Sequence, residues 1–240
     1  MLNPIVAHRG WSGHYPENTI LSIKKGLNHP IVNMIEMDVQ LSRDGVPVII
    51  HDYTLERTTN GTGFVGNHTL LELKKLDAGS WFSNEYNKET IPSLEEVFQA
   101  FKPFSNRGKK LNLEIKRGGD FYQGIEKKVV SLIQRYRLEN SILITSFNHE
   151  TIHTFSQVGP DITRGLLIYG VPVLTHELLQ YTGSTLLSMS YPYLTSTFIK
   201  PLLNQGIQCI AWTVDDPHHM KQIASLDSRI AICTNHPERF

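Results

Sequence analysis

The sequence predicts an α/β fold, namely one TIM (β/α)8 barrel with a small insertion after the second strand. Two observations lead to this expectation. Short apolar or β-branched runs alternate with helix-like segments, a pattern typical of βαβ units and a parallel sheet. These runs number eight, and 240 residues is close to the usual length of one such barrel. We therefore expect residues 1–240 to form a single domain.

Eight segments are expected to be strands, because each is a short apolar run bounded by turn or helix signals. The second of them carries an extension after a turn. In chain order the candidates are Pro4–Ala7, Met34–Val39 with its extension Val46–Ile50, Leu111–Ile115, Ile142–Thr145, Gly165–Ile168, Leu186–Met189, Gln208–Trp212 and Ile230–Cys233.

Several helices have recognisable start signals between these strands. Glu17-Asn18-Thr19 comes before the apolar positions of the first helix. Ser93 with Glu96 three residues later forms a capping-box pattern, and Asn148 comes before another apolar periodic segment. Each signal supplies a side-chain oxygen for the free N–H groups of a first helical turn.

The segment at about 53–92 interrupts this alternation. It carries the turn-rich runs Asn60-Gly61-Thr62-Gly63, Gly66-Asn67 and Asp77-Ala78-Gly79-Ser80, with little sustained period. We expect it to be an inserted subdomain over the barrel mouth.

Composition and charge limit the partners. Lys plus Arg and Asp plus Glu number 23 each, so no overall field favours nucleic acid or an anionic membrane, and we expect a small-molecule partner. No basic leader and no run of about 18 apolar residues is present, so we expect a cytoplasmic protein without a stable membrane anchor. Cys209 and Cys233 lie in apolar runs and are expected to be buried reduced thiols. The oligomeric state stays open.

Three carboxylates are candidates for a metal site. Glu36 and Asp38 stand two residues apart on a predicted strand, so both project to the same face, and Glu114 ends another apolar strand. Buried carboxylates need positive charge nearby, and a hard divalent cation such as Mg2+ or Ca2+ takes oxygen ligands. Lys116, on the same face as Glu114, could neutralise phosphate charge. Ion pairing with neighbouring basic residues is the alternative.

Two histidines are candidates for acid and base. His8 follows the first strand and His51 follows the extension of the second, and barrel active sites lie where strands end. Cleavage of a phosphodiester needs one group to take a proton and another to give one, and histidine titrates near neutral pH. Arg9, with its planar fork of donors, suits phosphate. The other nine of the eleven histidines are given no catalytic role.

Taken together, these residues resemble the glycerophosphodiester phosphodiesterases of the soluble bacterial type. The matching motifs, in order and spacing, are His8-Arg9-Gly10, Pro16-Glu17-Asn18-Thr19, Glu36-x-Asp38, His51-Asp52, Arg57-Thr58-Thr59-Asn60-Gly61-x-Gly63, Ile91-Pro92-Ser93-Leu94, Leu113-Glu114-Ile115-Lys116, Ser146-Phe147 and Trp212-Thr213-Val214. They cover nearly the whole chain, and the ordered set is far more specific than any one motif.

The resemblance implies a metal-dependent hydrolase that converts glycerophosphodiesters to glycerol 3-phosphate and an alcohol. By position it implies an acid/base pair (His8 and His51), ligands for one divalent cation (Glu36, Asp38 and Glu114) and substrate contacts (Arg9, Lys116, Asn18 and Trp212). Trp212 is equally well read as a core aromatic. Two positions depart from the family pattern, because Asn235 replaces an acidic residue and Asp215 stands where Asn is expected.

Two other readings remain open at this point. One is a lysophospholipase D-like barrel that acts on lipid substrates, and the other is a catalytically silent barrel that binds phosphodiesters. Several properties also stay open: Mg2+ versus Ca2+, the preferred alcohol headgroup, and attack by water versus the glycerol 2-hydroxyl through a cyclic phosphate.

Overall fold

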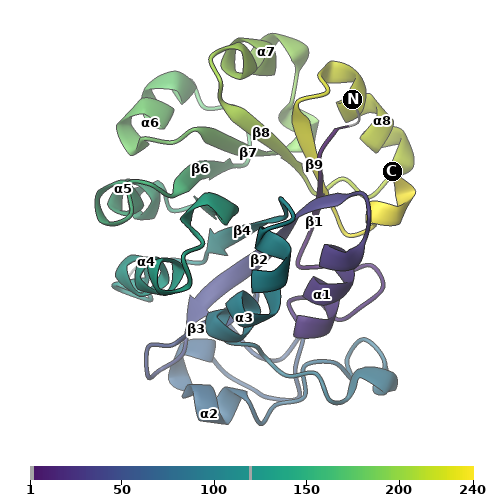
Figure 1. Ribbon diagram of the computed structural model, residues 1–240, viewed down its shortest axis with the longest axis vertical. Coiled ribbons are helices and arrows are strands. Elements are labelled where there is room, and N and C mark those ends of the chain that lie inside the picture. Colours follow the sequence, from purple (N-terminus) through teal and green to yellow (C-terminus); the bar gives the residue numbers. More distant parts are fainter. Residues whose placement is uncertain (1–2, 119–120) are drawn as a thin grey trace.

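The computed structural model describes residues 3–118 and 121–240, and Figure 1 shows strands encircled by helices. The strands are β1 (Ile5–Ala7), β2 (Val32–Leu41), β3 (Pro47–Ile49), β4 (Lys110–Ile115), β5 (Ile142–Ser146), β6 (Thr163–Ile168), β7 (Leu186–Ser190), β8 (Gln208–Trp212) and β9 (Ile230–Thr234). The helices are α1 (Ile20–Asn28), α2 (Leu70–Leu73), α3 (Leu94–Ser105), α4 (Ile125–Tyr136), α5 (His149–Val158), α6 (Thr175–Thr182), α7 (Ser196–Asn204) and α8 (Pro217–Leu226).

Eight parallel strands close into the predicted barrel. The order is β1-β9-β8-β7-β6-β5-β4-β2, and pairing of β1 with β2 completes the ring. The expected extension of the second strand is a separate strand, β3, which runs antiparallel to β2 with Val39 opposite Ile49. A tight turn separates the two strands. In this turn Gly45 adopts φ 75°, and its N–H donates to the carbonyl of Ser42 at 2.8 Å. Gly45 accepts this left-handed conformation without steric cost.

The structure confirms the three predicted helix-start signals. Thr19 accepts a hydrogen bond from the backbone N–H of Ser22 at the start of α1. Ser93 and Glu96 form a complete capping box before α3, and the Asn148 side chain accepts from the N–H of Thr151 in α5. These bonds satisfy N–H groups that have no partner within the helix.

The alternation of side chains along β2 divides two environments. Ile35, Met37 and Val39 belong to the large apolar core between strands and helices. Glu36 and Asp38 have the opposite parity and therefore project into the barrel. A second apolar cluster comprises Val6, Leu143, Leu186, Ile210, Ala231 and Cys233 on strands that ring the barrel. Polar groups thus share the interior with an apolar packing layer.

Residues 53–92 add a small apolar cluster beside the barrel. Figure 1 places this segment below β3, at the edge of the helix ring, with α2 at its outer side. Thr69 and Glu72 form a capping box at the start of α2. The cluster consists of Val48, Ile50, Leu55, Val65, Leu73, Ala78 and Ile91, so the segment packs on β3 and on the loop that follows it.

Both cysteines are buried and unpaired, as expected. Burial raises the pKa of the Cys209 thiol to about 12, so the thiol stays protonated at neutral pH. No helix in the described part of the chain is long and apolar enough to cross a membrane.

Candidate active site

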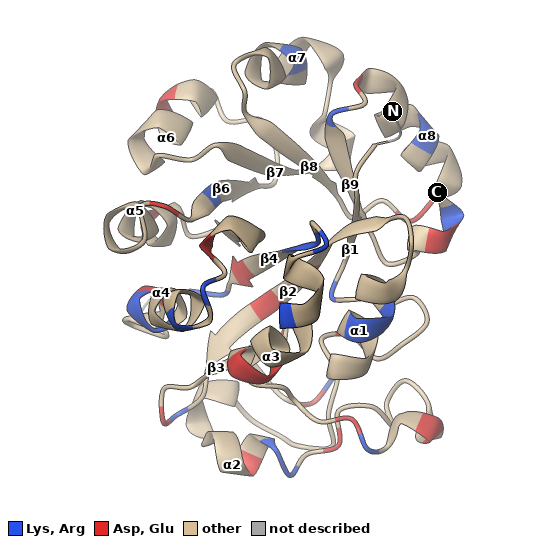
Figure 2. Cartoon of the chain, in the orientation of Figure 1, with Lys and Arg blue, Asp and Glu red and all other residues tan. Residues whose placement is uncertain are grey.

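The three predicted carboxylates meet inside the barrel. In the parallel pairing of β2 with β4, Asp38 lies opposite Glu114 and Glu36 lies opposite Asn112. Figure 2 shows these acidic positions as red segments on the β2 and β4 ribbons, within the ring of helices. Oxygen atoms of Glu36, Asp38 and Glu114 all lie within 4.8 Å of one another. The exposed fractions of the residues are only 5%, 1% and 9%.

The neighbouring basic side chains do not fully balance the negative charge of the three carboxylates. Burial, followed by repulsion from Asp38 and Glu114, raises the pKa of Glu36 well above its usual value. Oε1 of Glu36 is buried and has no hydrogen-bond partner among residues 3–118 and 121–240. Burial also raises the pKa of Glu114. An all-oxygen, partly unsatisfied anionic cluster is the donor set that Mg2+ or Ca2+ prefers, so these residues fit a hard divalent cation.

Asp38 remains ionised because two cations contact it. Lys116 Nζ lies 3.0 Å from Asp38 Oδ1 and Arg9 Nε lies 3.4 Å from Oδ2. Burial opposes ionisation, but these two cations outweigh it and hold the pKa of Asp38 well below its usual range. Lys116 also contacts Glu114. The structure therefore brings Lys116 and Arg9 to the carboxylates, as the sequence predicts.

His8 is held in one tautomer by its partner. Nδ1 donates to Oδ1 of Asn235 over 2.7 Å, which leaves Nε2, 3.8 Å from Glu36 Oε2, without a proton. Burial and the neighbouring Arg9 lower the pKa of His8 to about 4. His8 is thus a neutral imidazole with a free lone pair directed toward the carboxylate cluster.

The orientation of the Asn235 amide follows from Asp215. The Asn235 Nδ2 group donates to Asp215 Oδ2 over 2.7 Å, and the Asn235 backbone N–H donates to Oδ1 over 2.8 Å. Because an ionised carboxylate only accepts, the amide must present its oxygen to His8. Ser12 Oγ donates to the same oxygen at 2.7 Å. The two departures from the family pattern are therefore hydrogen-bonded to each other, with acid and amide exchanged.

His51 has a different partner. Its Nδ1 donates to Asp52 Oδ1 over 2.6 Å, and Arg57 donates from Nε and Nη2 to Asp52 at 2.7 and 2.9 Å. These bonds from Arg57 are the largest reason why the pKa of Asp52 lies well below its usual range. Burial lowers the pKa of His51. Nδ1 is committed to an anion, and Nε2 is left for a ligand.

Gln40 fixes the loop that carries His51. It lies two residues after Asp38 on β2 and is fully buried. Its Nε2 group donates to the carbonyls of Ile50, His51 and Asp52 at 2.8 to 2.9 Å. This side chain therefore ties the backbone of the histidine loop to the strand that carries two of the carboxylates.

Glu17 links Arg9 to Arg57. Its carboxylate accepts from Arg9 Nη1 at 2.8 Å and from both terminal nitrogens of Arg57 at 2.8 and 2.9 Å. The Arg9 backbone has φ 56°, and its carbonyl accepts from the Asn18 N–H at 3.0 Å and from Ser22 Oγ at 3.1 Å. Several bonds thus hold Arg9 in a sparsely populated conformation beside the carboxylates.

A cavity of about 140 Å3 opens beside this cluster. Its lining includes the following charged, polar and aromatic groups: His8, Arg9, Glu36, His51, Asn112, Glu114, Lys116, Phe147 and Trp212. Two predicted residues differ from the rest. Asp38 is covered by Lys116 and Arg9, and Asn18 is buried beneath the site, where its Nδ2 donates to Asp38 Oδ2 at 2.8 Å.

Sequence reasoning missed several residues that position the site. Gln40 continues the i, i+2 series of Glu36 and Asp38, which is a signal that could have found it. Glu17 and Arg57 stand inside motifs quoted above for the family resemblance, but pairing between them is visible only once the chain is folded. The roles of Asn235 and Asp215 were not foreseen for the same reason.

Comparisons with known proteins identify the family of the chain. The model of the glycerophosphoryl diester phosphodiesterase family matches residues 8–239. A glycerophosphodiester phosphodiesterase of Caldanaerobacter subterraneus subsp. tengcongensis is 37% identical over 98% of this chain and 94% of its own length. One of Bacillus subtilis is 32% identical over 98% of this chain and 84% of its own.

A solved structure extends the comparison. An Oleispira antarctica phosphodiesterase in complex with the product sn-glycerol-3-phosphate superposes with a TM-score of 0.87 at 31% identity. The alignment covers 99% of this chain and 95% of that one. The chain therefore belongs to the glycerophosphoryl diester phosphodiesterase family of enzymes.

Proposed function

We propose that this chain hydrolyses glycerophosphodiesters to glycerol 3-phosphate and an alcohol, as a single catalytic domain that depends on one divalent cation. The observation that carries the proposal is the arrangement of His8 and His51 on one cavity with the carboxylate cluster. Each histidine commits Nδ1 to a protein acceptor and leaves Nε2 for a ligand. That the Oleispira antarctica relative binds sn-glycerol-3-phosphate as its product supports the choice of substrate.

Glu36, Asp38 and Glu114 would hold the cation. The unsatisfied Oε1 of Glu36 and its raised pKa support this assignment, because both point to a missing positive charge. When bound, a divalent cation supplies charge that stabilises the developing negative charge on phosphate oxygens. Asn18 would not contact the cation itself. Its hydrogen bond to Asp38 orients one of the three carboxylates that would bind the cation.

The two histidines divide the proton transfers according to their partners. His8, paired with the neutral Asn235 amide, takes the proton of the attacking hydroxyl or water at its free Nε2. His51, paired with the anionic Asp52, is the better imidazolium and delivers a proton to the leaving oxygen. An anionic partner stabilises a protonated ring, whereas a neutral amide does so less.

The remaining predicted residues contact the substrate. Arg9 and Lys116 oppose the charge on the phosphate, and both stand at the cluster already in ionised form. Trp212 lines the cavity with a buried indole N–H that has no acceptor in the described part of the chain. We assign this ring to the glycerol side, where its face can pack on carbon and its N–H can meet a hydroxyl.

Product analysis tests the proposed reaction. The protein with Mg2+ or Ca2+ is incubated with glycerophosphoethanolamine, and phosphorus NMR follows the products. We expect glycerol 3-phosphate and ethanolamine. Release of glycerol and phosphoethanolamine would place the cleavage on the other side of the phosphorus and contradict the proposal. Binding of the diester without any cleavage would support the silent barrel instead.

A second candidate substrate class is lysophospholipids. Apolar side chains are exposed on the segment after β6, with exposed fractions of 71% for Tyr169, 97% for Val173 and 62% for Leu174. The Tyr169 ring lies 6.3 Å from the ring of Trp212, which lines the cavity. Exposed apolar surface at a site is typical of contact with an apolar ligand. Turnover of micellar lysophosphatidylcholine above that of glycerophosphocholine would establish this class.

A further inference from the structure

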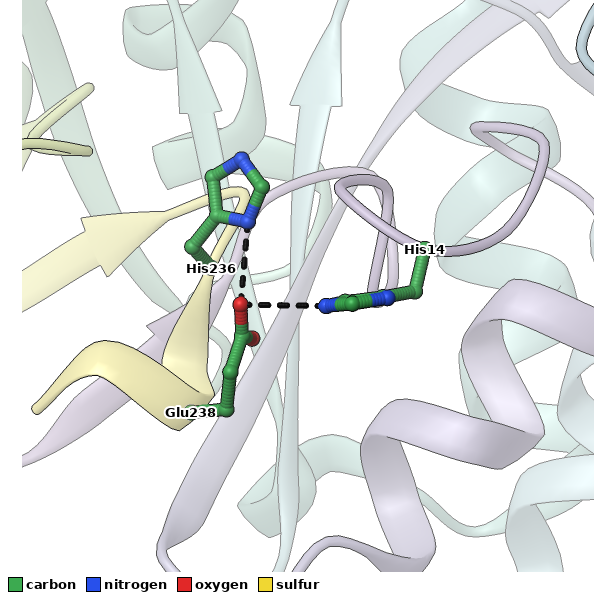
Figure 3. A group of neighbouring side chains, drawn as sticks. All are labelled: His14, His236 and Glu238. Atoms are coloured by element: carbon green, nitrogen blue, oxygen red, sulfur yellow. Dashed lines mark hydrogen bonds and ion pairs between the residues drawn. The ribbon is translucent and has the colours of Figure 1, made fainter.

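A second cluster of metal-ligating side chains lies outside the cavity. Figure 3 shows His14, His236 and Glu238, with both imidazole rings directed at one carboxylate oxygen. His14 belongs to the loop between β1 and α1, and the other two lie at the turn Pro237–Arg239 or directly before it. Glu238 Oε1 is 3.1 Å from His14 Nε2 and 3.0 Å from His236 Nδ1. The cluster thus joins two segments far apart in the sequence.

The spacing of these atoms suits a transition metal. The three ligand atoms lie within 4.8 Å of one another. In a tetrahedral site with bonds of about 2.0–2.1 Å, neighbouring ligand atoms are roughly 3.3 Å apart. Two of the three separations, those from Glu238 Oε1 to the two histidine nitrogens, already approach that value. Two imidazoles and a carboxylate suit Zn2+, Ni2+ or Cu2+, whereas Mg2+ and Ca2+ prefer oxygen alone.

Neighbouring groups hold the cluster in place before any ligand binds. Trp11 Nε1 donates to Glu238 Oε2 at 2.8 Å, so the carboxylate presents Oε1 to the histidines. The Gly13 N–H donates to the Asn235 carbonyl at 2.9 Å, which fixes the two segments together. A Cβ atom at Gly13 would lie 2.4 Å from the His236 ring, so only glycine admits that ring here. Such orienting contacts are typical of metal sites.

We propose that His14, His236 and Glu238 form a binding site for one transition-metal ion, distinct from the oxygen-only site inside the barrel. His14 is 52% exposed, Glu238 29% and His236 21%, so the site is open to solvent and water completes the coordination. The ion would cross-link the loop that follows His8 to the turn that follows Asn235. Because His8 and Asn235 form the hydrogen bond that sets the His8 tautomer, this cross-link would stabilise the two backbone segments that carry the bond.

Calorimetry with Ni2+ tests the site while saturating Mg2+ occupies the carboxylate cluster. We expect one Ni2+ per chain in the wild type and at least about tenfold weaker binding in His14→Ala and in Glu238→Gln. His176→Ala is the matched control, because His176 is also exposed but lies on α6. The control should bind Ni2+ like the wild type. Equal Ni2+ affinity in His14→Ala and the wild type would overturn the proposal.

Electron paramagnetic resonance of Cu2+ at one equivalent, again with saturating Mg2+, supplies an independent readout. We expect splitting from two imidazole nitrogens in the wild type and from one in His14→Ala. A spectrum of oxygen ligands alone would overturn the proposal, and a hydrogen-bonded cluster without metal affinity would then be the whole role of these residues. His14 lies outside the proposed catalytic machinery, so hydrolysis in Mg2+ within about twofold of wild type confirms that the variant is folded.

Discussion

At the scale of single residues, the two proposed catalytic histidines differ in the charge of the group that is hydrogen-bonded to Nδ1. His8 faces the neutral amide of Asn235, and His51 faces the anionic carboxylate of Asp52. Each partner is itself fixed, Asn235 by Asp215 and Asp52 by Arg57. The roles of base and acid therefore rest on four partner residues as well as on the histidines.

Removal of either histidine tests these roles. We expect His8→Gln and His51→Gln each to lower kcat by about 100-fold to 10,000-fold, since each loses one proton transfer. Circular dichroism should stay unchanged, because both side chains line a cavity and leave the apolar core intact. His153→Gln is the control, because its ring lies outside the cavity lining and bonds at the surface to the Tyr181 carbonyl and to Gln157. Wild-type rates in both variants would refute the assignment.

The lowered pKa of His8 predicts a pH dependence of stability. The unfolded chain binds this proton near pH 6.5 and the folded chain only near pH 4, so protons favour the unfolded state between these values. In metal-free protein we expect the free energy of unfolding to fall by up to about 3 kcal/mol from this source as pH drops from 6.5 to 4. Urea unfolding of wild type and His8→Gln measures it. Parallel pH curves for the two proteins would contradict the prediction.

Exchange of acid and amide tests the Asp215–Asn235 pair. In Asp215→Asn, the new amide nitrogen replaces the carboxylate oxygen that accepts from Asn235 Nδ2, so two N–H donors face each other. The Asn235 amide then rotates by about 180° and presents its nitrogen to His8. His8 then carries its proton on Nε2, and we expect kcat to fall by at least about 100-fold. The double variant Asp215→Asn with Asn235→Asp restores an acceptor for Nδ1 and should recover most of the rate. No recovery would show that the pair does not act through the tautomer.

At the scale of elements, the alternation of side chains along strands explains what the sequence could predict. Glu36 and Asp38 share parity on β2, and Glu114 and Lys116 share it on β4, so each pair could be assigned to one face from the sequence. Strand β3, which follows the turn at Gly45, was predicted as an extension of the second strand. Its antiparallel direction and register could not be predicted, because both depend on pairing with β2. Gln40 was missed since its three acceptors lie on a loop ten to twelve residues away.

Helix α3 offers a test at the same scale. Its capping box uses Ser93 Oγ to accept from the Glu96 N–H, while Glu96 accepts from the Ser93 N–H at 2.7 Å. We expect Ser93→Ala to lower the free energy of unfolding by about 1 kcal/mol, through loss of one partner of the helix N-terminus. Denaturant titration measures this loss, with Ser196→Ala after the Thr195 cap of α7 as the control. Equal losses in both variants would argue against the capping role.

At the scale of the whole molecule, closure of the barrel assembles the site. Around one cavity the chain brings residues from β2 and from every strand from β4 to β9, together with residues of the loops after β1, β3, β4, β5 and β8. The sequence could predict that the candidate residues gather at one end of the barrel, because barrel sites lie where strands end. It could not predict bonds such as Asn235 to His8, which join residues 227 positions apart. Such contacts depend on how the ends of the sheet meet.

The most direct measurement of the central claim is the rate of glycerol 3-phosphate release before and after chelation, with Glu36→Gln beside the wild type. If the three buried carboxylates hold the required cation, release stops in EDTA and returns as Mg2+ or Ca2+ saturates one site. Glu36→Gln should then need a higher metal concentration for half of its maximal rate. Full turnover by the chelated wild type would contradict the account, and so would a metal requirement that Glu36→Gln leaves unchanged.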